Sequence, residues 1–133
     1  MEQPKVTGFR RIARSIRLSS AGFRYAIAHE VAIREELIAL AVLVPLSALL
    51  PVTDIEHLIL VLSMMFVIFA EFLNSAIEST VDRISSEHHP LAGRAKDLAN
   101  TAVAIAVLMM GLCWVVIAGP VLFRCLESRL FST

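Results

Sequence analysis

The chain has 133 residues, of which 57% are hydrophobic and 18% charged, and its formal net charge is zero. This composition is too apolar for a small soluble domain, and a mean hydropathy of +0.75 predicts a small integral membrane protein. The balanced charge predicts no nucleic-acid partner, and two cysteines are too few for a disulfide framework.

Residues 8–28 have the pattern of an amphipathic helix. Arg10, Arg14, Arg17 and Arg24 recur at spacings of four, three and seven residues. The opposite side of such a helix is apolar, with Phe9, Ile12, Ile16, Phe23 and Ile27. These features are typical of a helix that lies in the membrane surface, with its arginines toward lipid phosphates or another anion. Contact with headgroups alone would account for most of these arginines.

Three apolar stretches follow, and they predict transmembrane helices at 32–50, 55–80 and 96–122, with a tail at 123–133. In the first stretch, only the fourteen residues 37–50 are free of charge. Fourteen residues make about 21 Å of helix, whereas the hydrocarbon core of a bilayer is about 30 Å thick. The first span must therefore begin before residue 37, with charged residues in its first turns.

The basic residues predict the orientation of these spans. Seven of the twelve Lys and Arg precede residue 35, and three more lie between residues 83 and 96. By the positive-inside rule, the amino terminus and the second loop are cytoplasmic, and the carboxyl terminus lies on the other side. The polar ends of all three spans then meet near one cytoplasmic level, which brings together Glu30, Glu36, Glu71, Asn74, Glu78, Lys96 and Asp97.

The stretch from 70 to 82 is the most informative part of the chain. A helix through it carries Glu71, Asn74, Glu78 and Asp82 along one face, because offsets of three, four and seven return to the same side. Carboxylates at membrane depth are costly, so they usually face a bundle interior or a water-filled cleft and serve a function. The alternative is a helix that leaves the membrane with a polar face among the headgroups.

Two classes of function fit these groups. Oxygen ligands favour magnesium, which is commonly held by one or two carboxylates together with substrate phosphates. A further Glu could accept a hydroxyl proton and Lys96 could offset phosphate charge, and phosphoryl transfer needs little more than such positioning and charge compensation. A small proton- or cation-coupled transporter uses membrane carboxylates equally naturally. The chain contains no Gly-rich phosphate-binding motif and no cysteine cluster for a metal, so the residues alone leave both classes open.

The run from Ala70 to Arg83, followed by Glu87-His-His89 and Gly93-Arg-Ala-Lys-Asp97, resembles the prokaryotic diacylglycerol kinase family. The resemblance extends from about Gly8 to Val121, and its further matching positions are Gly8, Phe9, Arg11, Glu30, Arg34, Glu36 and Trp114. The Glu-x-x-Asn-x-x-x-Glu-x-x-x-Asp and Lys-Asp elements are specific to this family. Undecaprenol kinases share its fold, but the Arg-Ile pair after Asp82, the Gly-Arg-Ala-Lys-Asp run and Trp114 look more like the Gram-negative diacylglycerol kinases.

The resemblance implies an all-α membrane protein, in which an N-terminal amphipathic surface helix and three transmembrane helices build a homotrimeric bundle in the bacterial inner membrane. It implies ATP-dependent phosphorylation of diacylglycerol to phosphatidic acid at the cytoplasmic face, with Mg²⁺, in phospholipid metabolism. Active sites would be shared between neighbouring subunits. Undecaprenol or another lipid alcohol is the alternative acceptor.

The resemblance also assigns roles by position. Glu71 matches the general base on the lipid hydroxyl, with Asn74 as the positioning residue beside it, and Glu30 and Glu78 match magnesium ligands. Positions that match nucleotide contacts are Arg11, Leu18, Glu30, Glu78, Glu87, His88, His89, Lys96 and Asp97. Positions that match the lipid side of the site are Arg11, Ser19, Arg24, Arg34, Glu36, Glu71, Asn100 and Trp114.

The chain departs from the family pattern in three places. Asn100 stands where the family usually has a small Ser, at the lipid-facing side of the site. The surface helix lacks the aromatic residues expected around 18–20. The tail after Phe123 is longer than usual.

Overall fold

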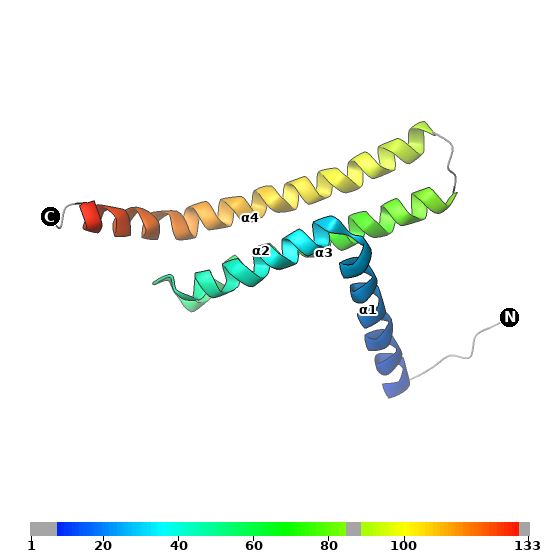
Figure 1. Ribbon diagram of the computed structural model, residues 1–133, viewed down its shortest axis with the longest axis horizontal. Coiled ribbons are helices and arrows are strands. Elements are labelled where there is room, and N and C mark those ends of the chain that lie inside the picture. The colour runs from blue at the N-terminus through cyan, green and yellow to red at the C-terminus, as the bar shows by residue number, and fades with distance from the viewer. Residues whose placement is uncertain (1–7, 85–88, 131–133) are drawn as a thin grey trace. The chain divides into compact units, whose positions relative to one another are not determined.

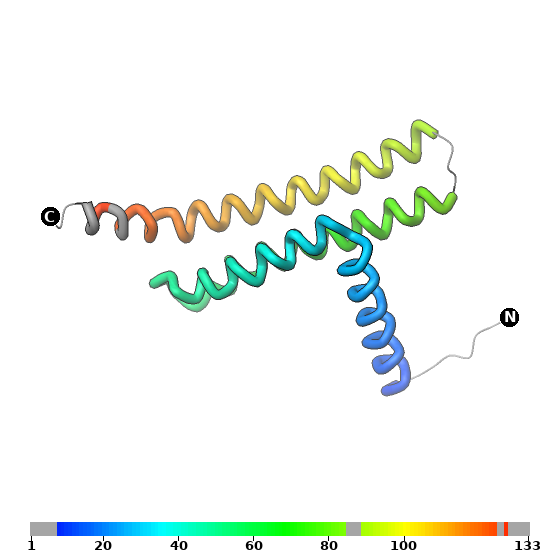
Figure 2. Tube along the Cα trace, in the orientation of Figure 1, coloured from blue at the N-terminus to red at the C-terminus, as the bar shows by residue number. Residues whose placement is uncertain are grey.

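The computed structural model describes residues 8–84 and 89–130, and its regular structure there is entirely α-helical. In chain order the helices are α1 (Phe9–His29), α2 (Val31–Ala48), α3 (Asp54–Ile84) and α4 (Pro90–Leu130). They belong to two compact units, one containing α1 (Met1–Val31) and one containing the other three helices (Ala32–Thr133). Figure 1 labels the four helices, and Figure 2 traces the chain through them. The predicted all-α fold is confirmed.

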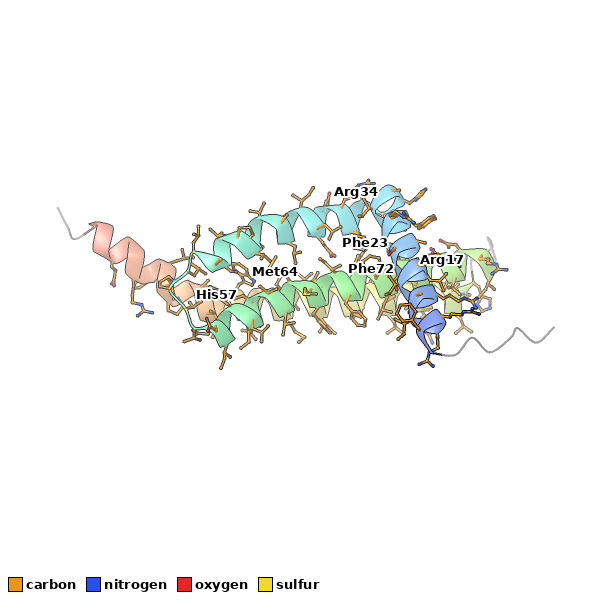
Figure 3. All side chains as sticks on the ribbon, turned by 90° about the horizontal axis from the view of Figure 1, so that it is seen from below. Arg17, Phe23, Arg34, His57, Met64 and Phe72 are labelled. Atoms are coloured by element: carbon orange, nitrogen blue, oxygen red, sulfur yellow. The ribbon has the colours of Figure 1, made fainter. Side chains whose placement is uncertain are left out.

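The first unit is the amphipathic helix α1. It begins after Gly8, whose φ of 67° is accessible to glycine without strain. The helix carries five arginines and no acidic residue, with Arg17 and Phe23 marked in Figure 3. It ends at His29, and the next residue, Glu30, is extended and donates its backbone N–H to the Ala26 carbonyl oxygen at 2.8 Å. One extended residue therefore separates α1 from α2, in agreement with the predicted boundaries of 28 and 32.

The second unit begins with α2, whose 18 residues make about 27 Å of helix. Ser47 is buried near its end, and its hydroxyl donates to the Val44 carbonyl oxygen at 2.8 Å, so the hydroxyl is satisfied within the helix. A short turn follows, in which the N–H groups of Leu49 and Leu50 donate to the carbonyl oxygens of Leu46 and Ser47. This turn ends α2 two residues before the predicted residue 50.

A capping box fixes the start of α3. The Thr53 backbone N–H and hydroxyl each donate to a Glu56 carboxylate oxygen at 2.8 Å, and the Glu56 N–H donates to the Thr53 hydroxyl at 3.4 Å. This reciprocal pair satisfies N–H groups that a helix otherwise leaves unpaired at its first turn. The helix therefore begins at Asp54, and His57, which Figure 3 labels, follows three residues later.

The antiparallel pair α3 and α4 forms the main packed element, and in Figure 1 the green part of α3 runs alongside α4. Five of the six buried residues on α3 recur at spacings of four, three, four and three, namely Leu60, Met64, Val67, Glu71 and Asn74, and the sixth is Ala70. This 3.5-residue period keeps one face of a helix against its neighbour. We call this row of residues the α3 seam. Its apolar part packs with Ala106, which is fully buried on α4, in a cluster that also includes Val67 and Ala70.

Small residues let α4 approach the α3 seam closely. Ala99, Ala106 and Ala118 are the buried residues of α4 among those with described side chains. Helices that pack in a membrane use small side chains in this way, because dispersion contacts between closely spaced backbones replace the hydrophobic effect. The seam is therefore tight on the α4 side.

The outer faces of the second unit are apolar. Large hydrophobic side chains at least half exposed there include Ile55, Leu58, Phe69, Leu98, Leu108, Leu112 and Val115. Among the described residues, two helices are long and apolar enough to span a membrane, α3 and the Pro90–Arg124 part of α4. The helix α2 carries three charges in its 18 residues, Arg34, Glu35 and Glu36, and is not one of these two.

The helix α4 is longer than the predicted span of 96–122 at both ends. It begins at Pro90, a residue suited to the first helical position because its missing N–H would be unpaired there anyway. At the other end, the predicted tail of 123–133 is helical as far as Leu130. There Arg124 donates its Nε–H to the Pro120 carbonyl oxygen at 3.3 Å.

The packing of Ala106 predicts the effect of enlarging it. We expect Ala106→Leu to lower the free energy of unfolding by about 1–3 kcal/mol, because a larger side chain must displace the α3 seam. The matched control is Ala104→Leu, since Ala104 is exposed on the same helix. Unfolding of the detergent-solubilised protein in a denaturant titration measures both variants. Equal stability of the two variants would contradict the packing of α4 on the α3 seam.

Candidate functional site

The candidate site lies where the α3 seam changes from apolar to polar. Leu60, Met64 and Val67 occupy the seam first, and Glu71, Asn74 and Glu78 continue it at the same spacing. Glu71 is 8% exposed and Asn74 7% exposed, while Glu78 is half-buried. The predicted polar face of this helix is therefore turned into the protein at its first two positions and reaches the surface only later. A helix whose polar face simply meets headgroups would leave all of these side chains exposed.

The Asn74 side chain holds a buried acceptor that lacks a donor. Its Oδ1 atom has no hydrogen-bond partner among the described residues. A buried carbonyl oxygen left in this way costs free energy, which proteins rarely tolerate without a function. A bound group that donates a hydrogen bond, or a cation, would satisfy it.

Two carboxylates from different helices approach one another beside Asn74. Glu36 on α2 lies near enough to Glu71 on α3 for their like charges to interact, and the Glu36 Oε2 atom is buried without a partner in the described part of the chain. The predicted convergence of the polar ends of α2 and α3 is thus observed for this pair. Two like charges held together in this way are suited to sharing a proton or binding a cation.

The helix α4 contributes a cation to this site. Lys96 Nζ lies 2.6 Å from Asp82 Oδ1, and the nearby Glu78 carboxylate also acts on it electrostatically. This places the ammonium of α4 beside the polar end of the α3 seam, as the convergence predicted. The sequence alone assigned no partner to Asp82, although its place on the face of Glu78 was visible from their spacing of four.

Other predicted residues on α4 lie farther from these groups or serve the helix itself. Asp97 and Asn100 are exposed. Trp114 is eight residues beyond Ala106, which packs at the level of Ala70, so its ring lies about 12 Å along the helix from that level. Its Nε1 is buried and has no acceptor among the residues that the structure describes. Trp114 therefore lies farther along α4, away from the polar end of the α3 seam.

His89 caps the first turn of α4. Its Nδ1 accepts a hydrogen bond from the Leu91 backbone N–H at 3.2 Å, and its carbonyl oxygen accepts from the Gly93 N–H at 3.1 Å. Because Nδ1 is an acceptor here, the ring proton lies on Nε2, which is left to donate to a ligand. The other two residues of the predicted loop contact, Glu87 and His88, lie outside the described residues.

The remaining predicted residues belong to the first unit or to the first turn of α2. On α1, Arg11, Leu18, Ser19 and Arg24 are all exposed, and Glu30 is half-buried at the extended joint after the helix. Arg34 is half-buried on α2 (Figure 3). The four exposed side chains on α1 are accessible to an anion or a lipid headgroup.

The donor set fits a magnesium ion held jointly with a substrate. No group of three or more His, Cys, Asp or Glu side chains that could hold a metal occurs within residues 8–84 and 89–130. Magnesium does not need such a cage, since one or two carboxylates with phosphate oxygens and waters suffice. Glu78 offers a carboxylate, and one turn away the unpartnered Asn74 oxygen offers a further hard acceptor.

Comparisons with known proteins show which family the chain resembles. The family model of prokaryotic diacylglycerol kinase matches residues 17–118. A diacylglycerol kinase of Escherichia coli (strain K12) is 42% identical over 111 residues, which cover 84% of this chain and 91% of the relative. A diacylglycerol kinase of Haemophilus influenzae is 39% identical over 119 residues, 90% of this chain and 98% of the relative. One of Pseudomonas aeruginosa is 38% identical over 111 residues, 84% and 90% respectively.

The unpartnered oxygen of Asn74 predicts an unusual mutant. We expect Asn74→Leu to leave the free energy of unfolding unchanged or to raise it by about 1 kcal/mol, because an apolar side chain of similar size removes an unsatisfied buried amide. Denaturant unfolding of the ligand-free protein measures this difference. A loss of stability of about 1–3 kcal/mol would instead mean that the amide is hydrogen-bonded in the folded protein.

Proposed function

The chain belongs to the prokaryotic diacylglycerol kinase family, and from that premise we propose that it transfers the γ-phosphoryl group of ATP to the hydroxyl of diacylglycerol, which yields phosphatidic acid and ADP. Similarity over 84–90% of the chain to several bacterial diacylglycerol kinases carries this conclusion. The protein is thus a membrane-bound lipid kinase of phospholipid metabolism.

Glu71 serves as the general base. Its side chain is buried on the α3 seam, next to the Glu36 carboxylate. Glu71 accepts the proton of the acceptor hydroxyl, and the resulting oxygen nucleophile attacks the γ-phosphorus while the bond to ADP breaks. Asn74 lies one turn away and positions the reacting groups through its free Oδ1 atom.

The nucleotide occupies the polar end of the α3 seam. From their family positions, Glu78 and Glu30 would hold a magnesium ion together with phosphate oxygens, and a bound ion would supply positive charge against the phosphates. Lys96 supplies a positive charge beside Glu78. The further nucleotide contacts proposed from family positions are Arg11, Leu18, Glu87, His88, His89 and Asp97, with the Nε2 proton of His89 as one donor.

The lipid reaches Glu71 from the membrane. Glu36 lies at the level of Glu71 and meets the head of the acceptor, while Trp114 lies deeper and contacts the lipid below its hydroxyl. The indole Nε1 proton, which is buried without an acceptor among the described residues, suits an ester oxygen of a glycerolipid. The other lipid-side positions proposed from the family are Arg11, Ser19, Arg24, Arg34 and Asn100.

The active enzyme is a homotrimer with sites shared between subunits. One observation supports an assembly of several chains. The outer faces of α3 and α4 expose long apolar side chains that a neighbouring subunit or lipid must cover.

The chain spans the bacterial inner membrane three times, with α1 on its cytoplasmic surface. The helices α3 and α4 are apolar enough for this, and α2 spans once its three charged residues face the site or the interface. The excess of Lys and Arg before residue 35 and within residues 83–96 supports a cytoplasmic amino terminus and second loop, with a periplasmic carboxyl terminus.

The assay of acceptor specificity tests this function. Purified protein in mixed micelles with diacylglycerol, MgATP and labelled γ-phosphate should form labelled phosphatidic acid, and removal of magnesium with a chelator should abolish the product. Undecaprenol, tested in parallel, identifies the alternative lipid-alcohol kinase. If neither lipid is labelled, the proposed kinase is wrong.

Glu71→Gln separates the base from the binding residues. We expect turnover to fall by about 10²–10⁴-fold, the range typical for loss of a general base, while a non-hydrolysable ATP analogue still binds. Glu35→Gln is the matched control, because Glu35 is exposed on α2 and has no assigned role. Loss of nucleotide binding in a folded Glu71→Gln protein would instead indicate a ligand role for Glu71.

A further inference from the structure

The ion pair between Asp82 and Lys96 links the last turns of α3 to the start of α4. Its two charged atoms lie 2.6 Å apart, and the two residues are fourteen positions apart in the sequence. Asp82 has none of the roles proposed above. The Lys96 and Asp82 side chains are 37% and 64% exposed, and an ion pair so open to solvent adds little to fold stability. Stability alone therefore does not explain this contact.

The surroundings of Lys96 indicate another role. Its ammonium is hydrogen-bonded to Asp82 and is also attracted electrostatically by Glu78, one turn earlier on α3. A lysine has a long flexible stem, so an ammonium without a fixed partner samples many positions in solvent. A cation held at Glu78 would repel it further. Asp82 provides the attraction that keeps the ammonium beside the seam under these conditions.

We propose that Asp82 is a positioning residue of the kinase, whose carboxylate holds the Lys96 ammonium beside Glu78 so that it meets the phosphates of ATP. This inference rests on the proposed function, because it takes Lys96 as a nucleotide contact. Asp82 itself touches neither the phosphates nor the lipid. It acts by limiting where the lysine can be found, which lowers the entropy lost when the phosphates bind.

The lysine content of the chain makes the contact measurable without turnover. Lys5 and Lys96 are the two lysines of the sequence. An amine-reactive reagent applied to the full-length protein in detergent, followed by mass spectrometry, gives the labelling rate of Lys96 relative to Lys5. We expect Asp82→Asn to raise this ratio about threefold or more, since the ammonium loses its charged hydrogen-bond partner. The Asp54→Asn control, an exposed position at the far end of α3, should leave the ratio unchanged.

Kinetics then connect the contact to the reaction. We expect Asp82→Asn to raise KM for MgATP about tenfold with kcat changed by less than about threefold, the pattern of lost nucleotide binding. Asp54→Asn should match the wild type. The swapped variant Asp82→Lys with Lys96→Asp restores an ion pair but moves the positive charge to α3, so we expect its fold to be intact and its KM for MgATP to stay high.

Three results would overturn the proposal. The first is an unchanged Lys96 labelling ratio in Asp82→Asn. The second is a KM for MgATP that is unchanged or lowered. A lowered KM would mean that Asp82 competes with the phosphates for Lys96. The third is recovery of wild-type KM in the swapped variant, which would make the pair purely structural. A wild-type protein that phosphorylates no lipid would remove the proposed function, whereas the labelling ratio would still decide whether Asp82 holds Lys96.

Discussion

Two helices in a bilayer gain little from burying leucine against leucine, because the lipid tails are equally apolar. The pairing of α3 with α4 depends instead on close approach, and Ala106 allows it by presenting no side chain beyond a methyl group to Val67 and Ala70. The same seam continues into Glu71 and Asn74 without a change of period. Apolar packing therefore determines where the polar groups point, and the position of the site depends on the fit of α4 against this seam.

The sequence predicted this seam because its signal is strong. Offsets of three and four place Glu71, Asn74 and Glu78 on one face of any helix, and apolar residues before Glu71 show that the helix is embedded. The charge-free length of α4 likewise predicted a long helix. The boundary between α1 and α2 was predicted within a residue or two, because the polar residues around Glu30 interrupt the pattern, although no proline or glycine marks it.

Contacts between helices could not be predicted from the sequence in the same way. That Lys96 would pair with Asp82 rather than Glu78 depends on the register of two antiparallel helices, which periodicity within one helix does not contain. The cap formed by His89 depends on a backbone geometry at Pro90 that a pair of histidines does not reveal. The level of Trp114 likewise follows only from packing at Ala106. Periodicity within one helix thus indicated which residues share a face, but not which residues of a second helix they contact.

The length of the polar part of α3 has a consequence for how two very different substrates meet. Glu71 and Asp82 are eleven residues apart, which is about 16 Å along the helix. At one end the buried Glu71 adjoins the apolar part of the seam, an environment that suits the hydroxyl of the proposed lipid acceptor. At the other end Asp82 and Lys96 are accessible to solvent, an environment that suits the triphosphate of the proposed nucleotide. Glu78 lies between them and is half-buried. Over three turns, a single helix therefore presents polar groups to environments that range from buried to solvent-exposed. A helix with the same residues but a less tightly packed seam would let water reach Glu71, and the proposed base would then face solvent rather than an acceptor hydroxyl.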